Sequence, residues 1–358
     1  MLATSAESGV GNYAYAVARV KVRKAKLLGR ESYLKMMGMS LIEIARFLGE
    51  TQFSRDIHEL GLRFKDVDLI EHAMSSSLAR ASHEVLGFCQ GTLRDKVASY
   101  LERWDVYNLK TLLRGKLYGE QPEKLRHYLV PGGSMGESEL APLLQADGID
   151  GVIEGIEGSQ YHEVLATVRA RSERVLTVEA FENALDKAYY QSMIARIRVS
   201  SRADQVYLNW LRKEIDVVNL RNLFELKREN VEASVVQELM VPGGLQIKGP
   251  AMSALVNAES YDATLSQLEQ FSFYKDVREE AEVVRRGGAE HSLVVLERAL
   301  DRHLARTAVA FSHLDPLSVL PVIDYLLRLK IEVDNVRIIV RGKEKGMEDE
   351  RMRKLLVM

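Results

Sequence analysis

One motif occurs three times in this chain of 358 residues. The segment WDVYNLKTLLRGK at 104–116 returns as IDVVNLRNLFELK at 215–227 and as IEVDNVRIIVRGK at 331–343. Each copy has an acid, then Val, then Asn, then a cation two residues after the Asn, and ends in Lys. The repeated residues are Asn108, Asn219, Asn335, Lys116, Lys227 and Lys343. A repeat of such long period constrains the fold, because each copy is expected to form the same supersecondary unit.

Two further landmarks recur around this motif. A glutamate with an apolar residue before it and Ala two positions after it precedes each copy, as Glu71, Glu182 and Glu297. Pro-Gly-Gly follows the first two copies, at 131–133 and 242–244. Glu, Asn and Pro all move by the same 111 residues between the first two copies (71 to 182, 108 to 219, 131 to 242).

We therefore predict three repeat units, with boundaries near the two Pro-Gly-Gly segments, where Pro ends a helix and Gly permits positive φ. The predicted units are residues 1–129, 130–240 and 241–358, the third being truncated at its C-terminus relative to the others.

The apolar pattern within each copy predicts helix. Apolar residues stand at i, i+3 and i+7 in the Asn segments, for example Val106, Leu109 and Leu113, and they form one face of an α-helix. Leu293, Leu296, Leu300 and Leu304 do the same in a Glu segment. No sustained alternating pattern bounded by hairpin turns occurs, so the predicted fold class is all-α.

The composition indicates an ordinary soluble protein. With 49 basic and 51 acidic residues, the chain has no overall field that favours nucleic acid. Its single cysteine, Cys89, cannot form an internal disulfide, which fits a reducing cytoplasm. No segment approaches the roughly 18–20 apolar residues of a membrane-spanning helix, and the first dozen residues lack signal-peptide features. Membrane contact is therefore expected to go through a protein partner.

No segment predicts a catalytic, cofactor or metal site. The two Gly-Lys pairs, Gly115-Lys116 and Gly342-Lys343, lack the earlier Gly of a phosphate-binding loop. The eight histidines show no metal-ligand spacing. Recurrence of the three glutamates argues against catalysis, because an active site is usually built once from non-equivalent groups. We instead expect each Glu to pack near the Asn helix of its own unit and to bond to the Asn or to one of the cations, because a buried carboxylate needs a partner.

The basic segment at residues 13–28 has two interpretations. It could be an amphipathic helix that lies on an anionic membrane surface. It could also be the first helix of the first unit with a solvated basic face, which is the interpretation we favour.

The opening YAYAVARVKVRKAKLL, three Glu-x-Ala segments and three Asn-x-cation segments ending in Lys together resemble a known family over the whole chain. It is the family of the C subunit of archaeal-type rotary ATP synthases, which includes the d subunit of the vacuolar ATPase. The resemblance implies a funnel of three helical domains around a pseudo-threefold axis. It also implies a place on the cytoplasmic face of the membrane proteolipid ring, with a socket for the central shaft and no nucleotide or ion site.

In this resemblance the repeated Glu, Asn and Lys residues are framework residues, and the partner-binding residues are unknown. One position departs from the pattern. Leu226 stands where the other copies have Gly115 and Gly342, which predicts a different end for the second Asn helix.

The predicted function is that of a non-catalytic central-stalk connector in an A/V-type ATP synthase driven by protons or sodium ions. Its expected partners are the shaft subunits and the proteolipid ring, with neither nucleic acid nor a homo-oligomer required. One alternative is a helical-repeat scaffold unrelated to ATP synthesis, although common solenoid repeats are only roughly 20–50 residues long. The other is an enzyme with acids around a central cavity, for which the sequence offers no non-repeated group of acids.

Overall fold

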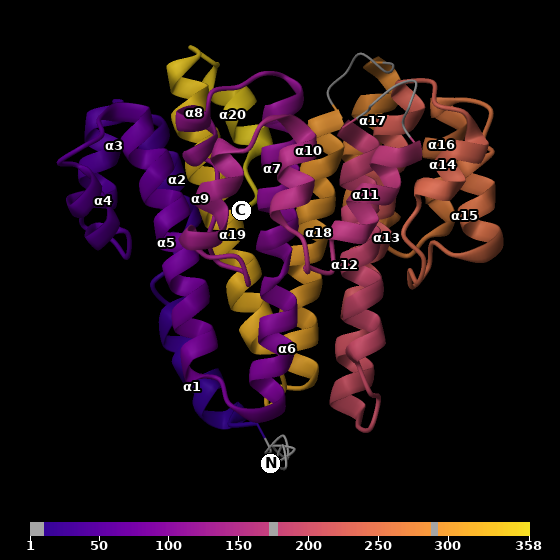
Figure 1. The fold of residues 1–358 in the computed structure, drawn as a ribbon, viewed down its shortest axis with the longest axis horizontal. Coiled ribbons are helices and arrows are strands. Elements are labelled where there is room, and N and C mark those ends of the chain that lie inside the picture. The colour runs from indigo at the N-terminus through magenta and orange to yellow at the C-terminus, as the bar shows by residue number, and fades with distance from the viewer. Residues whose placement is uncertain (1–10, 172–177, 288–292) are drawn as a thin grey trace.

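The computed structural model describes residues 11–171, 178–287 and 293–358. Within these residues the chain forms α-helices and one 3-10 helix and has no strand, which confirms the all-α prediction. Long helices run along the height of the molecule, and shorter helices gather around one half of it (Figure 1).

The long helices form three antiparallel pairs. The helices that carry the repeated glutamates, called Glu helices below, are α5 (Asp66–Phe88), α12 (Val178–Arg196) and α18 (Leu293–Leu314). The helices that carry the repeated asparagines, called Asn helices, are α7 (Arg103–Leu117), α13 (Arg202–Arg228) and α19 (Leu320–Glu344). In the first pair a separate helix, α6 (Gly91–Leu101), precedes α7, whereas α13 and α19 are continuous.

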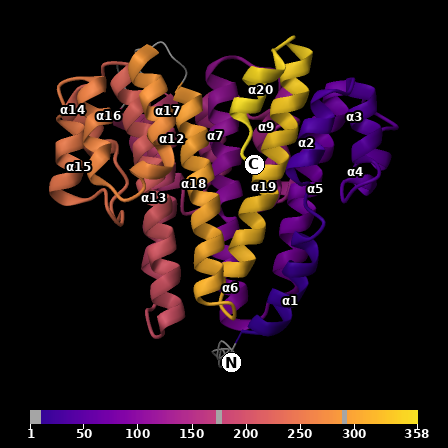
Figure 2. The same ribbon diagram turned by 180° about the vertical axis from the view of Figure 1, so that it is seen from behind.

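The shorter helices lie before, between and after these pairs. They are α1 (Tyr13–Lys24), α2 (Arg30–Met37), α3 (Leu41–Leu48), α4 (Ser54–Leu60), α8 (Pro122–Arg126), α9 (Glu137–Gln145), α10 (Gly148–Gly155), α11 (His162–Arg171), α14 (Ala233–Leu239), α15 (Gly249–Val256), α16 (Tyr261–Gln267), the 3-10 helix η1 (Leu268–Gln270), α17 (Tyr274–Gly287) and α20 (Asp349–Leu355). Helices α3 and α4 lie at one flank and α14 to α16 at the opposite flank, as Figures 1 and 2 both show.

The apolar stripes predicted for the Asn and Glu helices are buried in the structure. Leu293, Leu296 and Leu300 are at most 4% exposed, and Leu304 is 7% exposed. The nine positions of the Asn helices are also at most 4% exposed: Val106, Leu109, Leu113, Val217, Leu220, Phe224, Val333, Val336 and Val340. The periodicity therefore identified the inward face of each helix correctly.

The prediction that Leu226 changes the end of its helix is wrong. Each Asn helix ends nine residues after its Asn (Asn108 to Leu117, Asn219 to Arg228, Asn335 to Glu344). What differs is the packing of the short helix that follows. A Cβ at Gly115 would lie 2.3 Å from a methyl of Leu125 in α8, and one at Gly342 would lie 2.5 Å from the sulfur of Met352 in α20. In the second copy the buried Leu226 side chain fills this space itself.

Helix α1 is covered by protein on its apolar face. Ala16, Val17 and Val20 are buried, and the helix packs on α19 and α5. Arg23 forms an ion pair with Glu84 of α5 at 2.6 Å. The apolar face of α1 thus packs within the chain and is not left free to contact a bilayer. Among the residues placed by the structure, we find no helix with the length and apolar character needed to span a bilayer.

Candidate functional site

Each repeated Asn fastens a later segment of the chain to its helix. The Nδ2 of Asn108 donates to the carbonyl of Val130 at 2.7 Å, and its Oδ1 accepts the N–H of Val130 at 2.8 Å. Asn219 makes the same two bonds with Val241, both at 2.8 Å. Asn335 makes them with Val357, at 2.8 and 2.9 Å. Only a side-chain amide offers a donor and an acceptor in this arrangement, so the residue type follows from a structural task.

The acid three residues before the Asn fastens the loop that follows Pro-Gly-Gly. Asp105 accepts the backbone N–H groups of Ser134 and Met135, at 2.9 and 2.8 Å. Asp216 accepts those of Gln246 and Ile247, at 2.9 and 3.0 Å. Burial raises the pKa of both carboxyl groups, while the backbone hydrogen bonds act in the opposite direction.

This contact explains the second glycine of Pro-Gly-Gly. A Cβ at Gly133 would lie 2.2 Å from Oδ1 of Asp105, and one at Gly244 would lie 2.3 Å from Oδ1 of Asp216. Positive φ occurs in these two segments only at Gly243, with φ of 97°. The requirement for glycine at the second position is therefore steric, since the carboxylate must reach the backbone.

The third acid, Glu332, obtains its donors from the other end of the sequence. It accepts the N–H of Leu28 at 2.6 Å and a bond from the side-chain amide of Gln52. No ion pair to Glu332 is present among the described residues, and burial raises its pKa to about 8. The loop before α2 thus donates a backbone N–H to the acid of the third copy, as the loop after Pro-Gly-Gly does in the first two.

The closing lysines bind helix ends. Lys116 donates to the carbonyl of Leu144 at the end of α9, at 2.7 Å. Lys227 donates to Val256 at the end of α15 and to Ala258, at 3.0 and 2.7 Å. Cations are favoured at these positions because the last carbonyls of a helix lack intrahelical partners. Lys343 makes no such bond in the described part of the chain.

Glu71 and Glu182 bind cations, as expected of the repeated glutamates, but these cations lie on the Asn helix of another unit. Glu71 lies on α5, but its cations are Arg337 and Arg341 of α19, at 2.9 and 2.5 Å. Glu182 lies on α12 and pairs with Arg114 of α7 at 2.6 Å. Each Glu helix therefore contacts the Asn helix of a different copy.

Helix geometry explains this difference. Two residues along an α-helix correspond to a rotation of about 200°, so the Asn and the cation two residues later point in nearly opposite directions. Since the Asn faces its own later segment, the cation faces a neighbouring copy. Lys110 accordingly pairs with Asp186 of α12 at 2.6 Å, Arg221 pairs with Asp301 of α18, and Arg337 donates to Ser75 of α5 at 2.6 Å.

These contacts define three junctions between helices, which we name by their pairs: α7–α12, α13–α18 and α19–α5. The first copy is joined to the second, the second to the third, and the third to the first. The order of contacts is therefore cyclic.

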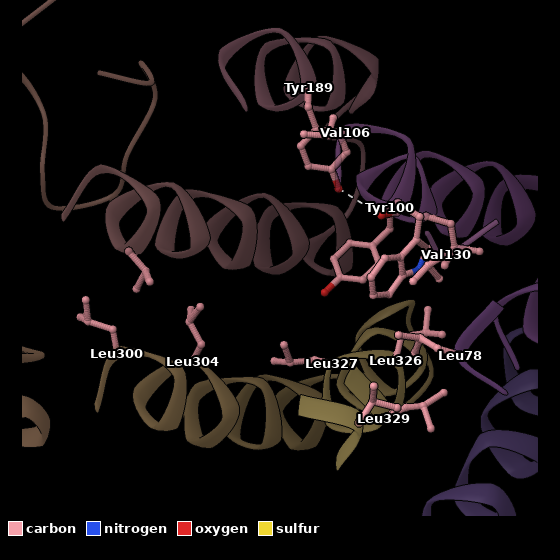
Figure 3. Close-up of a cluster of buried hydrophobic side chains, with 14 of the residues drawn as sticks. Leu78, Tyr100, Val106, Val130, Tyr189, Leu300, Leu304, Leu326, Leu327 and Leu329 are labelled. Carbon is pink, nitrogen blue, oxygen red and sulfur yellow. Dashed lines mark hydrogen bonds between the residues drawn. The ribbon is translucent and has the colours of Figure 1, made fainter. Parts of the chain in front are cut away.

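A buried polar cluster joins the first two pairs of long helices and was not predicted. Arg103 at the start of α7 forms an ion pair with Glu214 of α13 at 3.2 Å, and its guanidinium lies 3.5 Å from the centre of the Tyr100 ring. Burial alone would lower the pKa of Arg103, but the adjacent Glu214 carboxylate raises it above its usual range. Figure 3 shows Tyr189 pointing toward Tyr100. The hydroxyl of Tyr189 donates to the backbone carbonyl of Tyr100 at 3.1 Å.

The sequence did hold a signal for this cluster. Arg103, Glu214 and Lys330 each stand five residues before a repeated Asn, so equivalent positions carry opposite charges. Arg103 and Lys330 line one small cavity together, and Arg103 pairs with Glu214. Equivalent positions of opposite charge therefore indicate that the copies meet near these residues.

No group of three or more His, Cys, Asp or Glu side chains in the described ranges has the geometry to hold a metal ion. The rings of two histidines, His72 and His127, lie against one another at an angle of 43°, with their centres 3.9 Å apart. Burial, together with the charge of His127, lowers the pKa of His72 to about 4. Cys89 is buried, and burial raises the pKa of its thiol to about 11.

The repeated polar residues thus hold the helices and loops of an all-helical protein to one another. Comparison with known proteins identifies the family. The chain belongs to the ATP synthase (C/AC39) subunit family, whose sequence model matches residues 16–355. This confirms the resemblance noted from the repeated motif.

Several curated relatives, each named as the C subunit of an A-type ATP synthase, are similar over almost the whole chain. The relative from Haloferax volcanii is 34% identical over 351 residues, which cover 98% of this chain and 99% of the relative. The relative from Methanosarcina mazei is 33% identical over 354 residues, covering 98% and 94%. That from Archaeoglobus fulgidus is 32% identical over 346 residues, covering 97% and 96%.

Proposed function

We propose that this protein is the C subunit of a rotary A-type ATP synthase and acts there as a non-catalytic connector between the membrane proteolipid ring and the rotating shaft. The observation that carries the proposal is the similarity to C subunits of A-type ATP synthases along 97–98% of this chain. The protein would sit on the cytoplasmic face of the membrane and contact the membrane through its protein partners.

We also propose that the three repeat units, residues 1–129, 130–240 and 241–358, are arranged around a pseudo-threefold axis. The cyclic order of the α7–α12, α13–α18 and α19–α5 junctions supports this arrangement. In it the repeated Glu, Asn and Lys residues form the framework. Residues that differ between copies are then available to contact partners.

The mechanical task sets a requirement on the partner interfaces. One charge that crosses roughly 100 mV releases about 2.3 kcal/mol, so several ion steps store on the order of 10 kcal/mol before one ATP is made. An exposed ion pair contributes only about 0–1 kcal/mol. The connector therefore needs a shaped socket that buries at least roughly 1,200–2,000 Å² with its partners, with charge guiding the docking.

The rigidity of the protein itself supports such a role. Asn108, Asn219 and Asn335, which we call the Asn clamps, are buried. The side-chain amide of each one bonds both the N–H and the carbonyl of a single residue. Because buried hydrogen bonds are costly to break, these clamps limit relative movement of the segments that they join.

A binding experiment tests the proposal. The tagged full-length protein is immobilised and offered the purified shaft subunits at low salt and at about 0.15 M salt, where exposed charges are partly screened. We expect a complex of defined stoichiometry under both conditions, and an unrelated helical protein on the same resin provides the control. Failure to bind under both conditions, with the helical circular dichroism spectrum intact, would favour the alternative of a scaffold unrelated to ATP synthesis.

A second experiment tests coupling. Membrane vesicles that carry the complete synthase are compared with vesicles reconstituted without this protein. We expect ATP-driven ion transport to be lost without it, while ATP hydrolysis by the detached catalytic part continues. Ion transport that persists in its absence would contradict the connector role.

A further inference from the structure

The three junctions differ in charge at the position six residues after the repeated Asn. The first and third copies have Arg114 and Arg341 there, and these arginines bind Glu182 and Glu71 at 2.6 and 2.5 Å. The second copy has Glu225 at the same position. The charge is therefore reversed at the α13–α18 junction alone.

The geometry of the junction places Glu225 against another acid. In the α7–α12 junction, Lys110 pairs with Asp186. One turn later in α7 is Arg114, which pairs with Glu182, one turn earlier in α12. In the α13–α18 junction, Arg221 pairs with Asp301. The same one-turn step leads from Arg221 to Glu225 and from Asp301 to Glu297.

The electrostatics agree with this placement. Burial raises the pKa of Glu225, and the charges of Glu297 and Glu182 raise it further, while Arg228 and Arg114 act in the opposite direction. Glu297 has no ion pair or hydrogen bond among the contacts of the described residues, although its charge acts on Arg221. The carboxylates at this point repel one another where the other two junctions have an attractive pair.

Among the described residues, the α13–α18 junction also has the fewest ion pairs between its two helices. Both arginines of α19 bind Glu71, and two separate pairs join α7 to α12. Across α13–α18 one cation, Arg221, reaches one acid, Asp301, which is also shared with Arg298 of its own helix.

We propose that the α13–α18 junction is the weakest of the three and the place where the molecule opens first, so that α18 moves away from α13 while the other two junctions stay closed. The reversed charge at Glu225 is the reason that this junction opens before the other two. This order of opening is a property of the isolated protein and does not depend on its partners.

Hydrogen–deuterium exchange of the full-length protein tests the proposal, with the readout taken on α18 (Leu293–Leu314), whose sequence stays unchanged. Glu225→Arg restores the attractive pair of the other junctions. We expect it to slow exchange of the α18 amides by about threefold to tenfold, the effect of replacing a repulsive partly exposed contact by an attractive one. Exchange in α5, whose residues do not act on Glu225, should not change.

Three further variants sharpen the test. Arg114→Glu reproduces the reversed charge at the α7–α12 junction and should speed exchange in α12 by a similar factor. Glu279→Arg makes the same change of net charge on the exposed surface of α17 and should leave α18 unchanged. If Glu225→Arg does not fold, Glu225→Gln, which only removes the repulsion, should still slow exchange in α18. Equal effects of Glu225→Arg and Glu279→Arg on α18 would overturn the proposal, as would slower exchange at α13–α18 than at the other junctions in the unmodified protein.

Discussion

Leu28 donates its backbone N–H to Glu332 at 2.6 Å across a sequence separation of 304 residues. In the first copy the corresponding bond joins Asp105 to Met135, only 30 residues away. A glycine follows the donor in both cases and precedes a helix, Gly29 before α2 and Gly136 before α9. The N-terminal short helices therefore complete the third copy in the way that α9 and its neighbours complete the first.

This bond leads to a prediction about pH. Because the pKa of Glu332 rises from 4.5 to about 8 in the folded protein, the folded state holds a proton that the unfolded state loses first. The stabilisation from this carboxyl is complete below about pH 4.5 and is lost as the pH rises through about 8. Glu332→Gln keeps an acceptor for Leu28 and does not ionise. Relative to the unmodified protein, its free energy of unfolding should increase between about pH 5 and about pH 9, measured by urea titration.

The control for this prediction is Glu123→Gln, which alters an exposed acid of α8. Its difference from the unmodified protein should be nearly constant over the same range of pH. A Glu332→Gln variant with the same flat profile would show that the Glu332 carboxyl is already ionised near neutral pH.

The Asn clamps should each be necessary for stability. Asn219→Ala leaves the N–H and carbonyl of Val241 buried without partners, so we expect a loss of about 2–4 kcal/mol in the free energy of unfolding. Asn209→Ala on the same helix removes only a bond to Gln205 at the surface and should cost less than about 0.5 kcal/mol. Comparable losses in the two variants would contradict the structural importance of the clamp.

The second glycine of Pro-Gly-Gly should not tolerate a side chain. In Gly133→Ala the new methyl would lie 2.2 Å from Oδ1 of Asp105, and we expect a loss of about 1–3 kcal/mol. Gly29→Ala is the matched control, because no heavy atom lies within 4 Å of a Cβ there. In a double-mutant cycle, Asp105→Ala should suppress much of the additional cost of Gly133→Ala. Strict additivity of the two substitutions would argue against a direct clash.

The repeated glutamates should differ in their contribution to stability. The Glu71 side chain is 4% exposed and that of its partner Arg337 is 11% exposed, whereas Arg114, the partner of Glu182, is 61% exposed. Removing one member of a buried pair costs about 3–5 kcal/mol, because the other charge is left unpaired. We therefore expect Glu71→Ala to lower the melting temperature much more than Glu182→Ala. The reverse order in calorimetry would be inconsistent with these burials.

Sequence periodicity predicted the helices and their buried faces well. Val106, Leu109 and Leu113 and their counterparts are all inward, because a 3.6-residue period is a local property that survives any tertiary arrangement. The break between α6 and α7 and the exact partners of the repeated polar residues were not predictable in this way. The Arg103–Glu214 pair shows why, since a charge at one position gives no information on which distant helix will face it.

The sequence by itself determined the repeated unit: which segments are helical and which face of each is buried. Only the tertiary structure decided how the copies are joined. Glu71 binds the cations of α19 and Glu332 binds the backbone of Leu28, and the sequence does not indicate which copy or segment supplies each partner. The physical reason is that a carboxylate can be satisfied by any cation or any backbone N–H within reach. The choice between them is made by the packing of the helices that bring one group to the other.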